Sequence, residues 1–402
     1  MIQWHTLDYG ISTMKILLVS PEYYPFGIGG GSEVYKQLVH YYKKKKHSVT
    51  VVYGYYPTRS WNENLKKFKQ NGVQFYQVPL IPTPNKVPLL KTRLPCNFQA
   101  YSRLSQIITD EKPDVAHLHG TGFPFIDSMA HKLRQQNIPY IITNHGNPGK
   151  IFRSNVVIQT AWKLYTALML EPTLRGAKKI TFVSNYTKND SINKHRDKSI
   201  TIYNGIDSSW HRVNKKTINI RKKHKISRNE KIILTVGRIS EMKGLREMIS
   251  VLPTLLRKGM KVRYLIMGHL GDMGYKKNLD LLISKLHLQN NVIFLGFLPE
   301  EEKKQYYKQA DIIAIPSLWE GFGLVVLEAM SFNKVILSAN KGSLPEVHNQ
   351  YKKIVYLNDK SIVRSILEKM KLRSSFSFSK FDWDKISNEY LALLTAASRS
   401  VK

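Results

Sequence analysis

The sequence predicts an α/β fold built from two doubly wound, Rossmann-like domains. Short apolar runs that predict buried strands alternate with helical patterns along most of the chain. A polar, lysine-rich stretch over residues 214–231 separates one series of strands and helices from a second. A length of 402 residues exceeds the usual size of one domain, and 42% hydrophobic residues are enough to build two cores.

The expected domain boundaries follow from this alternation. Met14-Lys15 immediately precedes the first apolar strand, so we expect residues 1–13 to form an N-terminal extension outside the fold. These residues lack the basic start and apolar centre of a secretory signal. We expect an N-terminal domain over residues 14–207 and a second domain over 208–375. Residues 376–402 are expected to form a closing helix and a tail.

The first half opens with an apolar strand over residues 15–20 and a helix over 32–46 with Ser32 as its N-cap. Residues 150–179 are predicted to be mostly helical, with an interruption at Pro172. The other strands expected in this half are 48–53, 73–78, 115–118, 140–143, 179–183 and 199–203. The strands expected in the second half are 232–236, 262–267, 292–296, 311–315 and 335–338. Parallel sheets of this kind bind ligands in the loops at the carboxyl ends of their strands.

The stretch over residues 317–328 follows one of these strands and leads into a short apolar helix. Gly321 and Gly323 allow a tight turn that brings backbone N–H groups to the helix start, where an anion is favoured. Glu320 lies before the helix and Glu328 about one turn inside it, so the two carboxylates can contact different parts of one hydroxyl-rich ligand. A solvated Glu320 and a Glu328 in the first helical turn are the alternative interpretation.

A second loop, over residues 237–244, also stands directly after a strand and before a helix. Arg238 can donate two hydrogen bonds to a diphosphate and Lys243 can add a point charge. Two cations in an exposed loop are otherwise ordinary surface residues.

The glycine-rich loop over residues 27–31 approximates a dinucleotide-binding G-x-G-x-x-G through Gly27, Gly29 and Ser32. Six residues separate it from the preceding strand, and the next strand, 48–53, ends without an acidic residue for a ribose. An NAD-dependent enzyme is therefore the weaker alternative.

His119 and His145 stand just after two predicted strands. Each can be a hydrogen-bonded residue that lines a loop, or a residue that contacts substrate at the ligand-binding edge of the sheet. Neither has a third partner at metal-ligand spacing.

Two glutamates eight positions apart around Gly-Phe-Gly-Leu, Glu320 and Glu328, resemble the E-x7-E signature of retaining GT-B glycosyltransferases of family 4. The loop over 237–244 and the run over 114–120, which contains His119, also resemble this family. The resemblance extends from Met14 to about Leu394.

Two turns depart from the family pattern. Asn333-Lys334-Val335 stands where Gly-x-Pro is common, and Gly342-Ser343 replaces a usual pair of glycines. We expect these departures to alter a turn and not the chemistry.

The resemblance implies two Rossmann-like domains that face each other across a cleft. It implies catalytic roles for Glu320, His119, Arg238 and Lys243. The residues that it implies for donor binding are Gly30, Gly31, Arg238, Lys243, Gly268, Leu298, Glu320, Gly321, Phe322, Gly323, Leu324 and Glu328.

The implied chemistry is metal-independent transfer of a hexose with retention of configuration. Arg238 and Lys243 would stabilise the departing diphosphate, Glu328 would bind the ribose, Glu320 a hydroxyl of the donor sugar, and His119 would position sugar and acceptor. The family is thought to use front-face attack, which needs no carboxylate nucleophile. No cofactor is expected besides a nucleotide-sugar co-substrate such as a UDP- or GDP-sugar.

Asp382 and Asp384 could be mistaken for the metal-binding D-x-D of other glycosyltransferases. They precede a helical pattern, so we interpret them as the start of the closing helix, and we expect no metal site.

A formal charge of +33 predicts attraction to a polyanion. No zinc-finger spacing, basic heptad helix or RNP-like motif favours nucleic acid. We therefore expect an anionic membrane surface as a partner, a glycan or lipid-linked acceptor, and docking through the basic runs 43–46 and 150–179. A non-catalytic polyanion-binding protein is the remaining alternative.

The single cysteine, Cys96, cannot form an internal disulfide and agrees with a reducing compartment. The chain contains no run of eighteen apolar residues. We expect a cytoplasmic enzyme, peripheral on the inner membrane face.

Overall fold

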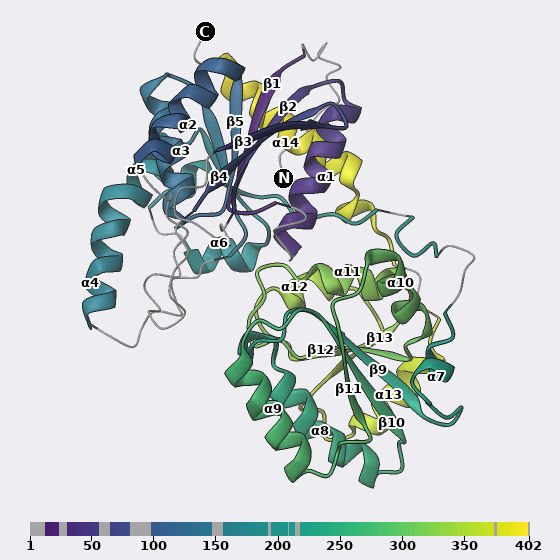
Figure 1. Cartoon of the computed structure of the whole chain (residues 1–402). Helices are drawn as coiled ribbons and strands as arrows, with labels where there is room; N and C mark the ends of the chain where they lie inside the picture. The colour runs from purple at the N-terminus through teal and green to yellow at the C-terminus, as the bar shows by residue number, and fades with distance from the viewer. Residues whose placement is uncertain are drawn as a thin grey trace. The chain divides into compact units, whose positions relative to one another are not determined.

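The computed structural model describes residues 13–23, 30–55, 65–80, 98–146, 156–191, 194–207, 209–213, 218–373 and 376–400. The chain divides into two compact units (Figure 1). The first unit contains residues 1–203 and returns at 383–402, and the second contains residues 204–382. Cys96 and the predicted loop with Gly27 and Gly29 lie outside the described residues.

The first unit is built on an eight-stranded sheet in the order β3-β4-β2-β1-β5-β6-β7-β8, parallel except for the antiparallel pair β3 and β4. Its strands are β1 (Lys15–Ser20), β2 (Ser48–Tyr55), β3 (Lys66–Gln70), β4 (Val73–Pro79), β5 (Val115–His119), β6 (Tyr140–Asn144), β7 (Lys179–Phe182) and β8 (Ser199–Thr201). The strand order reverses between β1 and β5, and this switch point is where open α/β sheets bind ligands.

Helices cover both faces of this sheet, and one of them comes from the far end of the chain (Figure 1). The helices are α1 (Gly30–Lys44), α2 (Phe98–Glu111), α3 (Pro124–Gln135), α4 (Val156–Tyr165), a π-helical turn (Thr166–Leu170), α5 (Glu171–Gly176), α6 (Asn185–Ser191), a 3₁₀ turn (Arg196–Lys198) and α14 (Trp383–Arg399). α14 contacts α1, β5 and β6, and its Tyr390 is buried against His117 with ring centroids 4.9 Å apart. The predicted closing helix is therefore part of the first unit.

The predicted start and end of α1 are wrong by two residues each. The helix begins at Gly30, so Ser32 lies inside its first turn, and the Ser32 hydroxyl is buried without a partner among the described residues. The helix ends at Lys44 because Lys46 adopts a left-handed φ of 65°, with Lys46 N–H donating to the Lys43 carbonyl and His47 N–H to the Tyr42 carbonyl. This pair of bonds is a Schellman motif, which here uses a lysine where glycine is usual.

The second unit contains a six-stranded, fully parallel sheet in the order β11-β10-β9-β12-β13-β14. Its strands are β9 (Lys231–Val236), β10 (Val262–Met267), β11 (Val292–Gly296), β12 (Ile312–Ile315), β13 (Val335–Ser338) and β14 (Ile354–Tyr356). Its helices are α7 (Ile220–Lys223), a 3₁₀ turn (Glu241–Lys243), α8 (Leu245–Arg257), α9 (Met273–Lys285), α10 (Glu300–Gln309), α11 (Leu324–Ser331), α12 (Leu344–His348), α13 (Ile362–Lys371) and a 3₁₀ turn (Ser379–Phe381). Here the order reverses between β9 and β12. The prediction of two doubly wound parallel sheets is confirmed.

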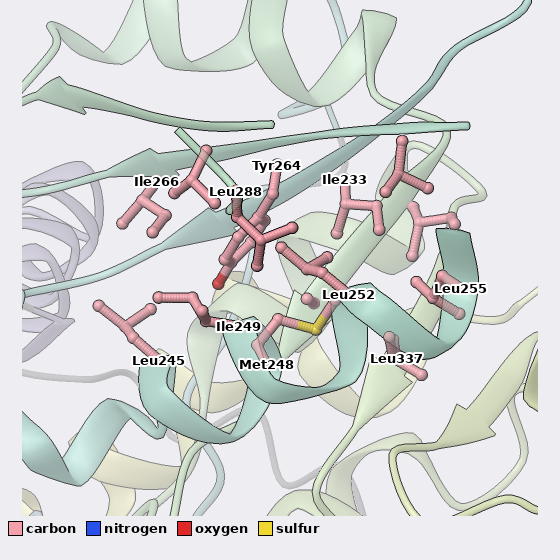
Figure 2. Close-up of a cluster of buried hydrophobic side chains, with 14 of the residues drawn as sticks. Ile233, Leu245, Met248, Ile249, Leu252, Leu255, Tyr264, Ile266, Leu288 and Leu337 are labelled. Carbon is pink, nitrogen blue, oxygen red and sulfur yellow. The ribbon is translucent and has the colours of Figure 1, made fainter. Parts of the chain in front are cut away.

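The core of the second unit fixes α8 against this sheet (Figure 2). Helical spacing places Leu245, Met248, Ile249 and Leu252 on one face, and all four are at most 1% exposed. They pack on side chains of β9 and β10, including Tyr264. Each buried side chain of this size contributes about 1.5–3 kcal/mol to folding. The packing holds the start of α8, and with it the preceding loop, at the switch point.

Candidate functional site

Two loops meet at the switch point of the second unit. The loop after β9 runs from Gly237 to Gly244, and the loop after β12 contains Ser317 to Gly323. The Leu318 N–H donates to the Met242 carbonyl at 2.9 Å and joins the two loops. Gly244 has a φ of 61°, and a Cβ there would overlap the Pro316 carbonyl oxygen, so only glycine fits. The two loops are therefore in direct backbone contact, and the glycine at position 244 makes this contact possible.

Glu320 is held at the centre of this contact. Its Oε1 forms an ion pair with the Lys243 ammonium and accepts a hydrogen bond from Ser317 Oγ at 2.9 Å, and its side chain is 13% exposed. Ser343 donates to the Glu320 carbonyl from both its N–H and its Oγ, each at 3.1 Å. A Cβ at Gly342 would lie 2.7 Å from that carbonyl oxygen. Ser343, which departs from the family pattern, thus adds a bond that a glycine side chain could not supply.

Arg238 lies beside Lys243 on the same loop. The aliphatic chain of Lys243 packs on Gly237, where an added Cβ would be 3.3 Å from Lys243 Cε. The Arg238 side chain is exposed and passes over Gly271, where a Cβ would lie 2.6 Å from Arg238 Cγ. Its guanidinium has no hydrogen bond or ion pair with any residue that the structure describes. The loop therefore carries one paired cation, Lys243, and one, Arg238, that has no such partner among the described residues.

Glu328 lies in the second turn of α11 and is 14% exposed. Its Oε1 pairs with Lys303 Nζ at 2.9 Å, and its Oε2 accepts a 2.6 Å hydrogen bond from the Tyr307 hydroxyl. Burial, and then the Glu328 carboxylate, raise the pKa of Tyr307 well above its usual value. Lys303 also lies over the Trp210 ring, 5.1 Å from its centroid. The sequence analysis missed Lys303 and Tyr307, because nothing in α10 shows that it lies against α11.

The predicted glycine turn before α11 is present. Gly323 has a φ of 84° and directly precedes Leu324, the first residue of the helix, while Phe322 is 4% exposed and packs inward. Gly321 lies between Glu320 and this turn. α11 therefore starts four positions after Glu320.

The ends of β10 and β11 complete this edge. A Cβ at Gly268 would overlap the Gly237 carbonyl oxygen, and the Gly268 N–H donates to the Gly296 carbonyl at 2.8 Å. Phe297 is 53% exposed and stacks on His269 with centroids 4.2 Å apart and planes 22° apart, while Leu298 beside it is half-buried. The sequence analysis missed His269, whose position directly after Gly268 was a usable signal.

The first unit carries a different group at its own switch point. His119 ends β5 and is fully buried, and His145 follows β6. His119 Nδ1 and His145 Nε2 share a hydrogen bond at 3.1 Å. Tyr35 of α1 packs on both rings, with centroid distances of 4.7 and 5.4 Å. The two histidines that the sequence singled out separately therefore form one cluster.

Burial determines the charge of this cluster. It lowers the pKa of His145 to about 4, and burial followed by the neighbouring His117 and His145 lowers the pKa of His119 well below its usual value. His119 Nε2 is buried and has no partner among the described residues. Near pH 7 both rings are neutral.

His117, which the sequence analysis missed, lies under His119 with ring centroids 4.0 Å apart. Its Nδ1 is 3.0 Å from the Tyr42 hydroxyl and its Nε2 is 2.7 Å from Thr143 Oγ1. Burial, and then His145, lower its pKa to about 3. His117 and His119 stand two positions apart in β5. This spacing did not indicate a role for His117, because both residues are buried.

Gly30 and Gly31 form the start of α1. A Cβ at Gly31 would lie 3.0 Å from the Tyr35 hydroxyl oxygen, so a larger residue would press on the ring that supports the histidines. Gly31 therefore lies next to the Tyr35 ring that packs on the histidine cluster.

Two doubly wound sheets with polar groups at their switch points are the arrangement expected of a GT-B glycosyltransferase. Two protein-family models match the chain, "Glycosyltransferase Family 4" over residues 28–210 and "Glycosyl transferases group 1" over residues 216–376. The chain belongs to this glycosyltransferase family and is a glycosyltransferase.

Individual relatives agree with this assignment. The chain is 30% identical over 341 residues to the uncharacterized glycosyltransferase MJ1607 of Methanocaldococcus jannaschii, covering 83% of this chain and 82% of the relative. It is 24% identical over 304 residues to the phosphatidylinositol N-acetylglucosaminyltransferase GPI3 subunit of Saccharomyces cerevisiae, covering 75% of this chain and 62% of that protein. The crystal structure of Anabaena Alr3699/HepE in complex with UDP and glucose has the same fold, with a TM-score of 0.65, 17% identity, and coverage of 96% and 97% of the two chains.

Proposed function

We propose that this protein is a retaining glycosyltransferase that moves a hexose from a nucleotide-sugar donor to a hydroxyl of a lipid-linked or surface glycan precursor. The observation that carries the proposal is the ion pair of Lys243 with Glu320 at the switch point of the second unit, with Arg238 on the same loop as Lys243. A nucleotide sugar presents a diphosphate to cations and hydroxyls to a carboxylate. The complex of Anabaena Alr3699/HepE with UDP and glucose supports a UDP-sugar as the first donor to test.

In this proposal the ion pair is exchanged when the donor binds. The diphosphate takes the Lys243 ammonium, and the Arg238 guanidinium adds two N–H donors to it. Glu320, released from Lys243, accepts a hydrogen bond from a hydroxyl of the donor sugar. As the bond to the sugar breaks, negative charge grows on the diphosphate, and preorganised cations stabilise that charge without a metal ion.

Glu328 binds the ribose hydroxyls in this proposal. A carboxylate offers about four lone-pair sites, so Lys303 and Tyr307 leave acceptor capacity for two hydroxyls. The backbone at Gly268 and Gly321–Leu324 would approach the phosphates, with Phe297-Leu298 near the base. Lys303 and Tyr307 are therefore positioning residues for Glu328.

The first unit supplies the acceptor side in this proposal. His119 Nε2 is the polar atom that a sugar hydroxyl would reach, and Gly31 lies against the Tyr35 ring of the same cluster. Attack from the face of the leaving group needs no carboxylate nucleophile in this unit.

Nucleotide release in the presence of donor tests the function. We expect a UDP- or GDP-sugar to raise the thermal unfolding midpoint and NAD to leave it unchanged. NMR of the product would then show the configuration of the donor retained. A product with inverted configuration would show that the enzyme is not a retaining one. Stabilisation by NAD would favour an NAD-dependent enzyme. If no donor is transferred or hydrolysed, a non-catalytic polyanion-binding protein is favoured.

We further propose that the first unit docks on an anionic membrane surface, which presents the acceptor. The GPI3 relative is named for transfer to a phosphatidylinositol, and the charge of +33 exceeds what one nucleotide diphosphate requires. In α4 and the following π turn, Leu164 and Leu168 are 60% and 64% exposed and lie one turn apart. The sequence over 150–170 has three basic residues and no acidic one. Apolar side chains beside basic ones suit an anionic lipid surface, where each cation contributes about 1 kcal/mol.

The basic run 43–46 contributes less than its charge suggests. Lys44 and Lys45 contact the Asp384 carboxylate at 3.1 and 3.6 Å, and Lys43 donates to the Asn71 carbonyl. No helix within the described ranges is long and apolar enough to cross a membrane. We therefore assign more of the docking to α4 than to the end of α1.

Sedimentation with vesicles tests the docking. Binding should rise with the fraction of anionic lipid, fall with salt, and weaken at least tenfold in Leu164→Gln/Leu168→Gln. Leu281→Gln is the matched control, because Leu281 is 62% exposed in the second unit. If the wild-type protein does not bind anionic vesicles at low salt, a soluble acceptor is favoured instead. Self-association that the leucine variants abolish would show that α4 binds a second copy instead.

A further inference from the structure

The hydrogen bond between His119 and His145 links the proton positions of the two rings. We propose that His145 is a positioning residue, whose Nε2–H donates to His119 Nδ1 and keeps the His119 proton on Nε2. His119 then presents an N–H donor to a hydroxyl of the bound sugar. The identity of that ligand rests on the proposed function, whereas the proton position does not.

The linkage follows from the neutrality of both rings. A neutral imidazole carries one N–H and one bare nitrogen, and a hydrogen bond between two rings needs one of each. His119 Nδ1 and His145 Nε2 are 3.1 Å apart, so one of these two atoms carries a proton and the other does not. Whichever ring donates therefore determines the state of the remaining nitrogen of His119.

The direction of the bond follows from the chemistry of the two arrangements. If His145 donates, both rings carry their proton on Nε2, the form that a free histidine side chain prefers. If His119 donates instead, His119 carries its proton on Nδ1, and so does His145. The first arrangement costs neither ring its preferred form.

The surroundings keep His119 in this role. Tyr35 packs against both rings, and His117 lies 4.0 Å below His119. Both nitrogens of His117 are occupied, by the Tyr42 hydroxyl at 3.0 Å and Thr143 Oγ1 at 2.7 Å. His117 therefore does not compete with His145 for His119. The buried Nε2 of His119, which has no partner within the described part of the chain, is the atom left for a ligand.

The direct test is NMR of the full-length protein with ¹⁵N-labelled histidine, without donor, because two-bond couplings show which ring nitrogen carries the proton. The signals are assigned by comparison with His119→Gln and His145→Gln. We expect the Nε2–H form for both residues at pH 7. A wild-type His119 with its proton on Nδ1 would overturn the proposal.

Variants of His145 then connect the proton position to activity. In His145→Gln the side-chain amide N–H can still donate to Nδ1, so we expect the Nε2–H form of His119 and transfer within about threefold of wild type. His145→Glu presents only acceptors, which should move the His119 proton to Nδ1 and lower kcat/KM for transfer about tenfold or more, the value of one hydrogen bond. His131→Gln, a histidine of α3 outside the cluster, is the matched control.

The outcomes separate packing from positioning. If His145→Gln and His145→Glu reduce transfer equally while the His119 proton stays on Nε2, His145 contributes only packing and the proposal is wrong. If no donor supports transfer in the wild type, the proposed function fails while the NMR result still decides the direction of the bond.

Discussion

The two switch points of this enzyme bear opposite kinds of polar group. In the second unit, Lys243 pairs with Glu320 and Lys303 with Glu328, so charged side chains are held by opposite charges. In the first unit, His119 and His145 are neutral and bond to each other. The comparison teaches that the same sheet topology can carry charged pairs at one switch point and neutral, hydrogen-bonded rings at another. Charged pairs suit an anion that must be bound and released, whereas neutral rings suit hydroxyls.

The largest expected effect comes from removing one charge from the second unit. Lys243→Ala should lower kcat by about 10²–10³, because one preorganised donor to the growing charge of the diphosphate is lost. Initial rates at saturating donor measure the effect, and Lys285→Ala, an exposed lysine of α9, is the control. Unchanged turnover would show that Lys243 takes no part in the reaction. The contrast between charged pairs in the second unit and neutral rings in the first would then have no bearing on catalysis at Lys243.

Glu328→Ala should weaken donor binding by about 1.5–3 kcal/mol with a smaller change in kcat. Ribose contacts are similar in the ground and transition states, so the loss appears in affinity. Calorimetric titration with UDP or GDP measures it, with Glu368→Ala on the exposed face of α13 as control. A large fall in turnover at unchanged affinity would contradict the assigned role.

The neutral cluster should make the first unit sensitive to acid. Burial lowers the pKa of His145 to about 4, from 6.5 in the unfolded chain. Because the unfolded chain binds the proton more readily, this stability is present above pH 6.5 and is lost as the pH falls toward 4. Thermal unfolding between pH 7 and 5 should therefore depend less on pH in His145→Gln than in the wild type. Equal slopes would show that folding does not lower the pKa of His145.

The smallest effect concerns the support of Glu328. Tyr307→Phe removes one hydrogen bond to its Oε2 and should weaken donor binding by about 0.5–1.5 kcal/mol, less than Glu328→Ala. A loss as large as that of Glu328→Ala would mean that Tyr307 contacts the donor itself. Tyr356→Phe, an exposed tyrosine of β14, is the control for this titration.

Sequence patterns predicted most of the fold because buried strands are apolar and short helices separate them. They missed β3, whose residues Lys66–Gln70 are exposed at the sheet edge and polar except for Phe68, and β14, which has only three residues. They also misplaced the ends of α1, where a lysine adopts the conformation that usually indicates glycine.

The candidate site, like the fold, was predicted only where the sequence shows the ends of buried strands. Residues directly after a strand, such as Arg238 and His119, could be assigned to a ligand-binding edge. Their partners could not. Lys303 is 25 positions from Glu328, and only the strand order places β5 beside β6 and so joins His119 to His145.

The return of α14 to the first unit has a consequence for the order in which the chain is made. The ribosome releases β1 to β8 first, then the whole second unit, and only afterwards the helix whose Tyr390 covers His117. During synthesis the nascent sheet of the first unit therefore waits with one face uncovered near Tyr42 and His117. Pulse-labelled nascent chains should resist protease in the second unit before they resist it at β5 and β6.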